Sequence, residues 1–210
     1  MKKLFVKESF YSILVGLFIG CLLIANILAG RIFTVYGDWT LTGGVFIFPF
    51  VFIINDLLAE VYGLKATKKA IYLGFIVNAV AVLFFTLINL LPSPIWASEV
   101  ADGYRLVLGT TWRALLASVL GYLVGNLTNA LIMDKMKNKH GKKLFKTRAI
   151  VSTIFGELLD SLLFVFVMFI GHLAITQMLF MIILQVVVKT LIETLVLPIT
   201  QTLVKRLDPQ

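Results

Sequence analysis

The sequence has 210 residues, of which 60% are hydrophobic and 14% are charged, and its mean hydropathy is +0.98. This composition lies far outside that of soluble globular domains and is typical of a polytopic membrane protein. The formal net charge of +8 does not indicate nucleic acid binding, because the basic residues gather at alternate ends of the apolar segments, near 2–7, 65–69, 135–148 and 205–206. By the positive-inside rule these clusters lie in the cytoplasm.

Hydropathy predicts an all-α fold in which one transmembrane domain covers the whole chain and both termini are cytoplasmic. Its six transmembrane helices are expected at about 10–30, 44–64, 70–91, 112–133, 147–171 and 176–203. The first apolar run follows lysines, as in a signal peptide, but its length and the lack of a small-x-small cleavage site favour a retained helix. We therefore expect a multi-pass membrane protein.

The connections and small residues add less specific information. Residues 32–43 are expected to form an outer loop, and residues 92–111 a short interfacial helix or a lid. The lone Cys21 excludes a disulfide, a zinc cage or an iron–sulfur cluster as an organising feature. Gly16 and Gly20 form a small-xxx-small pattern, which suits close contact with another helix or with a second subunit in a homodimer.

The expected helix 44–64 contains two carboxylates that an apolar helix should avoid. Its length at about 1.5 Å per residue matches the hydrocarbon core, and each buried acid costs a few kcal/mol there. Phe48, Phe52, Asp56 and Glu60 are spaced by four residues, so they lie along one stripe of the helix. We interpret this stripe as part of a site.

The expected helix 112–133 has a continuous polar edge. Ser118, Tyr122 and Asn126 are spaced by four, and Asn129 follows one turn later. Such residues can line a cavity, or they can only form hydrogen bonds between helices. Asn26, near the outer end of the first helix, is a further polar candidate.

Ionisable groups recur in the last two helices. The expected helix 147–171 contains Glu157 and Asp160, with Arg148 at its cytoplasmic end. The expected helix 176–203 contains Lys189 and Glu193. Together with Asp56 and Glu60 they contain more acids than bases, so some acids must be protonated, hydrated or paired. From their depth in the bilayer we expect Lys189 to pair with Asp160, with Asp56 as the rival partner.

Two interpretations of these charges remain open. The functional one is a polar cavity at the bilayer midplane that holds a small planar, nucleobase-like solute, because carboxylates and amides grip N–H edges and aromatic rings cover flat faces. The structural one is a buried ion-pair network that fixes helix register. An intramembrane aspartyl enzyme is disfavoured, since the chain has no metal-protease, nucleophile-elbow or phosphate-loop motif. We expect no metal or cofactor, because the two histidines, His140 and His172, lie on opposite sides of the membrane.

Several motifs resemble the queuosine precursor transporter family along nearly the whole chain. They are Asn26-Ile27, Asn55-Asp56 followed by Glu60-Val61-Tyr62-Gly63, Arg148 with Ser152-Thr153, Asp160 and Phe164, and Lys189 with Pro198. The resemblance implies a six-helix importer of the deazaguanine bases preQ0 and preQ1, and in some cases queuine. It also implies a fold similar to the substrate-binding subunits of energy-coupling-factor vitamin transporters. Such a subunit, for a vitamin or a nucleobase, is the nearest alternative function.

The resemblance and the charge pattern together give the candidate site. The substrate-binding candidates are Asn26, Phe48, Phe52, Asp56, Glu60, Asn126, Asn129, Glu157, Asp160 and Lys189. The coupling or gating candidates are Glu60, Arg148 and Glu193. Glu157 stands where the family more often has an amide, and Asn129 where many relatives have an acid. Because the buried acids are in surplus, a proton is the expected coupling ion, with facilitated diffusion as the alternative.

Overall fold

The computed structural model describes residues 2–140 and 145–207. The side chains of residues 2–9, 49, 52, 56, 60, 64, 130, 133–134, 137–140, 145–149 and 196–207 lie outside this description. The helices are α1 (Lys2–Leu28), α2 (Phe48–Asn89), α3 (Ser98–Leu108), α4 (Thr111–His140), α5 (Phe145–Phe169) and α6 (Ile175–Leu207), with short 3-10 turns at Gly43–Phe46 and Ile95–Ala97. Strands β1 (Ile32–Tyr36) and β2 (Trp39–Thr42) connect α1 to α2. The chain is mostly helical, as predicted.

Five segments of the described chain are long and apolar enough to cross a membrane: Phe10–Leu28, Lys65–Asn89, Ile95–Asn129, Ile150–Phe169 and Ile175–Leu195. They make the protein a multi-pass membrane protein. The sixth predicted span, 44–64, falls in the first half of α2, where several side chains lie outside the description. The count of six and the cytoplasmic placement of the termini therefore stay predictions.

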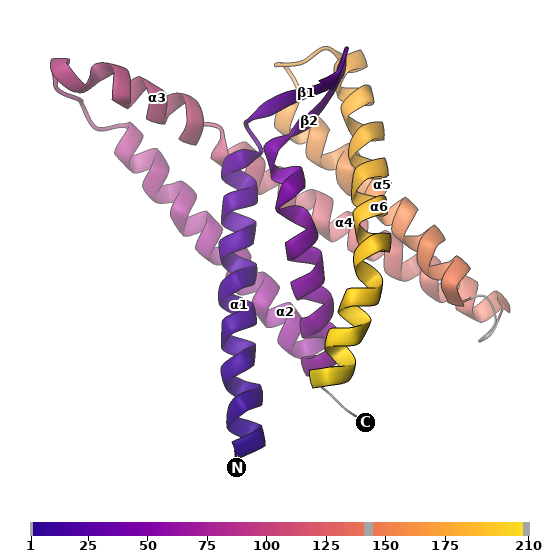
Figure 1. The fold of residues 1–210 in the computed structure, drawn as a ribbon. Coiled ribbons are helices and arrows are strands. Elements are labelled where there is room, and N and C mark those ends of the chain that lie inside the picture. Colours follow the sequence, from indigo (N-terminus) through magenta and orange to yellow (C-terminus); the bar gives the residue numbers. More distant parts are fainter. Residues whose placement is uncertain (1, 141–144, 208–210) are drawn as a thin grey trace.

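The connection predicted at 65–69 is not a loop. Helix α2 continues through it, and the chain instead reverses at Gly63, whose φ of 78° and ψ of 167° interrupt the helical backbone. Figure 1 shows the first half of α2 running away from the hairpin and the second half returning toward α3. A left-handed φ strains any residue with a Cβ, so a glycine suits this point. Thr67 Oγ1 donates a hydrogen bond to the Gly63 carbonyl across the bend.

The expected outer loop 32–43 is an antiparallel β-hairpin. Ile32 pairs with Thr42 and Phe33 with Leu41, and Gly37 at φ 53° forms the turn. The prediction was wrong because it weighed the turn formers above the β-branched and aromatic residues that flank them. Trp39 packs against Phe180 of α6, with ring centroids 4.9 Å apart, so the hairpin is anchored on the end of α6.

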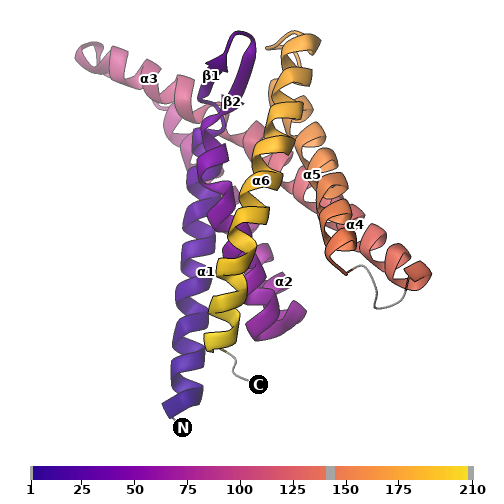
Figure 2. The same ribbon diagram turned by 45° about the vertical axis from the view of Figure 1, so that its right-hand side comes forward.

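The segment 92–111 contains the predicted short helix as α3, none of whose residues is buried. Both ribbon views show α3 standing apart from the other helices, at the end of the molecule that holds the hairpin (Figures 1 and 2). Trp96, just before it, is 88% exposed. An exposed helix with an aromatic residue suits a membrane interface.

Two apolar clusters hold the helices together. One joins α1 to the first half of α2 around Phe18 and Leu58, and the other joins α4, α5 and α6 around Val165 and Met181. Helices α4 and α5 lie against each other along their length (Figures 1 and 2). The polar side chains described next lie between these clusters.

Candidate functional site

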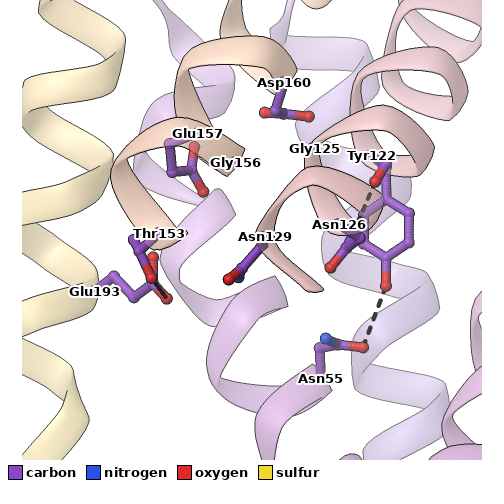
Figure 3. Close-up of a pocket in the computed structure, with 10 residues that line it drawn as sticks. All are labelled: Asn55, Tyr122, Gly125, Asn126, Asn129, Thr153, Gly156, Glu157, Asp160 and Glu193. Atoms are coloured by element: carbon purple, nitrogen blue, oxygen red, sulfur yellow. Dashed lines mark hydrogen bonds between the residues drawn. The ribbon is translucent and has the colours of Figure 1, made fainter. Parts of the chain in front are cut away.

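A polar pocket lies where α2, α4, α5 and α6 meet, with a volume of about 480 Å³ including its open mouth. Helix α4 gives it a tyrosine and two amides, α5 and α6 give it three carboxylates and a threonine, and α2 gives one amide (Figure 3). The lining residues are Asn55, Tyr122, Gly125, Asn126, Asn129, Thr153, Gly156, Glu157, Asp160 and Glu193. Polar side chains from four helices thus converge on one open space, as they do in small-ligand sites.

Lys189 provides the cation behind this pocket. Its Nζ lies 2.5 Å from Asp160 Oδ2 and 3.3 Å from Glu157 Oε2, and its side chain is 3% exposed. The predicted pair with Asp160 is therefore present, whereas the side chain of the rival, Asp56, lies outside the described residues. Nζ also lies 4.8 Å from the centre of the Phe48 ring, a cation–π distance.

Glycines on α4 bring the two carboxylates of α5 close to the pocket. A Cβ added to Gly121 would lie 2.9 Å from the backbone oxygen of Asp160, and one added to Gly125 would lie 2.9 Å from both Asp160 Cβ and the Gly156 carbonyl. Contacts this short exclude side chains, so the α4 and α5 backbones approach as closely as glycine allows. Gly121 and Gly125 are spaced by four residues, and this small-xxx-small signal was not used in the prediction.

The amide side of the pocket is partly cross-linked by hydrogen bonds. Tyr122 Oη donates to Asn55 Oδ1 at 3.4 Å, Asn126 Nδ2 donates to the Tyr122 carbonyl at 2.9 Å, and Thr153 Oγ1 donates to Glu193 Oε1 at 3.4 Å. Figure 3 shows Asn126, Asn129 and Asn55 on the side of the pocket opposite Glu157 and Thr153. Amides therefore face carboxylates across the pocket.

A second, smaller and mainly apolar pocket adjoins the polar one, since Tyr122 and Asp160 line both. It is otherwise lined by Phe18, Leu22, Phe48, Val51, Phe75, Ser118 and Phe164. The Phe48 and Phe164 rings meet edge to face at 6.3 Å, and Phe75 and Tyr122 at 5.8 Å. Flat apolar surfaces thus lie next to the Asp160 carboxylate.

Asn26 does not line either pocket. It is 3% exposed, donates through Nδ2 to Asn78 Oδ1 at 2.9 Å, and accepts from Ser118 Oγ at 2.6 Å. These bonds tie together α1, the second half of α2, and α4. A buried amide inside the bundle needs such hydrogen bonds from neighbouring helices, and the substrate contact expected for Asn26 stays a prediction.

The other predicted site residues divide into three groups. Five of them line the polar pocket: Asn126, Asn129, Glu157, Asp160 and Glu193. Phe48 lines the neighbouring apolar pocket, and Lys189 forms an ion pair with Asp160. The side chains of Phe52, Asp56, Glu60 and Arg148 lie outside the described residues. Five lining residues of the polar pocket were not predicted as ligand contacts: Asn55, Tyr122, Gly125, Thr153 and Gly156.

Some buried polar atoms near the site have no hydrogen-bond partner among the residues that the structure describes. They are Glu157 Oε2, Ser161 Oγ, Gln185 Nε2 and Thr190 Oγ1. Of these atoms, Glu157 Oε2 has Lys189 Nζ at 3.3 Å as an ion-pair partner. Across the described ranges, no group of three or more His, Cys, Asp or Glu residues is placed to hold a metal ion.

A comparison with known families gives one match. A family described as "Putative vitamin uptake transporter" matches residues 42–203, which include every element that lines the two pockets except α1. No curated protein and no solved structure matches the chain.

Proposed function

The chain belongs to the vitamin uptake transporter family, and from this premise we propose that it imports queuosine precursors across the cell inner membrane. The substrates we propose are the deazaguanine bases preQ0 and preQ1, with queuine as a further candidate. The family makes the chain a transporter and not an enzyme. The substrate and the way it is held are our inference.

The observation that supports the proposal is the meeting of carboxylates, amides and flat aromatic faces around Asp160. A deazaguanine presents adjacent N–H donors on one edge, and a carboxylate can accept two such bonds side by side. Asp160 lies at the boundary between the polar pocket and the aromatic one. A planar base bound there would place its N–H edge on the carboxylate and its faces against Phe48 and Phe164.

The amides of the polar pocket complete the proposed binding mode. Asn129 and Asn126 each offer a donor and an acceptor, which suit the carbonyl and ring nitrogens of such a base. Tyr122, which lines both pockets, would contact the ring. A buried site of this kind rejects ligands that leave its polar groups unpaired.

The roles that we propose for the two acids of α2, Asp56 and Glu60, rest on the sequence. We assign Asp56 a second contact to the base, and Glu60, which lies nearer the cytoplasm, a role with Arg148 and Glu193 in gating or proton movement. Proton coupling would use the surplus of intramembrane carboxylates. Facilitated diffusion followed by metabolic trapping would need the same binding groups.

Uptake of radiolabelled preQ1 by cells that express the chain tests the proposal. Asp160→Asn and Asp56→Asn each should lower the uptake rate at least about tenfold, because either change removes an acceptor worth about 1.4 kcal/mol or more. Glu99→Gln, a change in exposed α3, is the matched control and should keep uptake. Wild-type uptake by either aspartate variant would overturn the assignment of that residue.

The family match favours a second candidate, a vitamin as substrate with the chain acting as the binding subunit of an energy-coupling-factor transporter. That subunit would require separate ATPase and coupling subunits. Uptake by the chain alone, in a host without those subunits, argues against it. A thermal-shift panel of preQ0, preQ1, queuine, guanine and several vitamins identifies the ligand, because a ligand that binds only the folded state raises its unfolding temperature.

A further inference from the structure

One buried ammonium lies between two carboxylates but bonds mainly to one of them. Lys189 Nζ lies 2.5 Å from Asp160 Oδ2, with a hydrogen bond, and 3.3 Å from Glu157 Oε2. Glu157 Oε2 has no hydrogen-bond partner among the described residues, although its side chain is only 7% exposed. Lys189 thus forms ion pairs with both carboxylates, but the closer contact, with a hydrogen bond, is the one to Asp160.

The two carboxylates face different surroundings. Among the carboxylates that the structure describes, Asp160 is the one that lines both pockets, and it is 15% exposed. It is the more accessible group for a ligand that spans the aromatic and polar pockets. While Lys189 holds it, however, a ligand N–H must compete with a full positive charge.

Moving Lys189 away from Asp160 requires another anion at the same depth. A buried cation without a partner is strongly destabilising, because neither water nor a counter-ion compensates for its lost hydration. Glu157 Oε2 is such an anion, and the Phe48 ring, 4.8 Å from Nζ, gives the ammonium a further favourable contact.

We propose that Lys189 exchanges partners, bonding to Asp160 in the empty protein and to Glu157 when a ligand with N–H donors binds Asp160. The exchange moves one ammonium by a short distance, and no proton is transferred. Glu157 is thus a positioning residue that frees Asp160, and not a direct ligand contact. The ligand part of this inference rests on the proposed function, whereas the availability of Glu157 to Lys189 does not.

A stability cycle without ligand tests that availability. Glu157→Gln should change the unfolding temperature of the purified protein little when Asp160 is present. In an Asp160→Asn background Glu157 becomes the partner of Lys189, so the same change should lower the unfolding temperature by about 5 °C or more beyond its effect in wild type. Equal effects in the two backgrounds would overturn the inference.

A further variant without the cation serves as the control for folding. If the double variant Asp160→Asn with Glu157→Gln does not fold, adding Lys189→Met should restore folding, since no buried charge then lacks a partner. Failure of this rescue contradicts the partner exchange, because the loss would then come from packing and not from the cation.

Ligand binding gives the second arm. Glu157→Gln should weaken preQ1 binding at least about tenfold, because Asp160 can be freed only by leaving Lys189 without an anion. Glu157→Asp, which keeps the charge, should recover part of that loss, and Glu99→Gln should bind as wild type does. Wild-type affinity in Glu157→Gln overturns the exchange. If wild-type protein binds no deazaguanine, the proposed function is wrong. The unfolding temperatures of the ligand-free variants still test whether Glu157 can replace Asp160 as the partner of Lys189.

Discussion

Lys189 of α6 and Asp160 of α5 form an ion pair at 2.5 Å in which the carboxylate faces two pockets and the ammonium lines neither. The pair places a negative group at the surface of the cavity and keeps its counter-charge behind it. A membrane interior tolerates such charges only where each has a partner or reaches water. The arrangement suits a cavity that takes up a ligand with hydrogen-bond donors.

Removing the cation should destabilise the protein. In Lys189→Met, Asp160 and Glu157 lose the charge that they share, and we expect about 3 kcal/mol less stability, partly offset if one acid takes up a proton. Thermal unfolding in detergent measures this. Lys189→Arg keeps the charge and should lose less, so a larger loss in the arginine variant would contradict the ion-pair explanation.

The contact between α4 and α5 predicts a steric effect at Gly125. A Cβ there would lie 2.9 Å from Asp160 Cβ and from the Gly156 carbonyl, and a backbone atom cannot move aside cheaply. Gly125→Ala should therefore cost about 1–3 kcal/mol and displace Asp160, so that ligand affinity falls as well.

Gly16→Ala is the matched control for this substitution, because a Cβ at Gly16 meets nothing within 4 Å. In the isolated protein it should leave affinity unchanged and should not lower the unfolding temperature, since alanine favours the helix more than glycine does. Equal effects of the two alanines would show that close approach of α4 and α5 does not hold the site.

Hydropathy and charge predicted the helical segments and the Lys189–Asp160 pair because these depend on properties that each helix has by itself. Apolar length gives a span, and depth along a helix gives the level of a charge. The hydrogen-bond partners of Asn26 depend on which helices pack against α1, and the sequence around Asn26 does not specify that packing. The hairpin 32–42 and the single-residue turn at Gly63 were missed for a related reason, since short turns depend on local φ angles that composition reports weakly.

The bend of α2 predicts a backbone effect. Gly63 has a φ of 78°, and a Cβ there would meet nothing within 4 Å, so space does not prevent substitution. With a ψ of 167°, this positive-φ conformation is essentially restricted to glycine, so Gly63→Ala should be less stable by about 1–3 kcal/mol. Gly63→Asn should lose a similar amount, because asparagine tolerates the left-handed helical region and not a ψ of 167°, and a clearly smaller loss in the asparagine variant would contradict a conformational cause. Unfolding temperatures of the three proteins decide this.

The Asn26 network predicts a separation of stability from binding. Asn26→Leu leaves Asn78 and Ser118 without their partners in a buried region, which should cost about 1–3 kcal/mol. Because Asn26 lines neither pocket, preQ1 affinity measured well below the unfolding temperature should stay within about threefold of wild type, a difference under 1 kcal/mol.

Asn129→Leu provides the opposite case, since Asn129 lines the polar pocket and is partly exposed to it. Removing its amide should weaken preQ1 binding by about tenfold while lowering stability less than Asn26→Leu does, because a leucine beside lipid and an open pocket leaves fewer buried partners unpaired. Isothermal titration measures the preQ1 affinity of the two variants, and thermal unfolding measures their stability. If Asn26→Leu weakened binding more than Asn129→Leu, the division between a packing amide and a ligand-binding amide would be wrong.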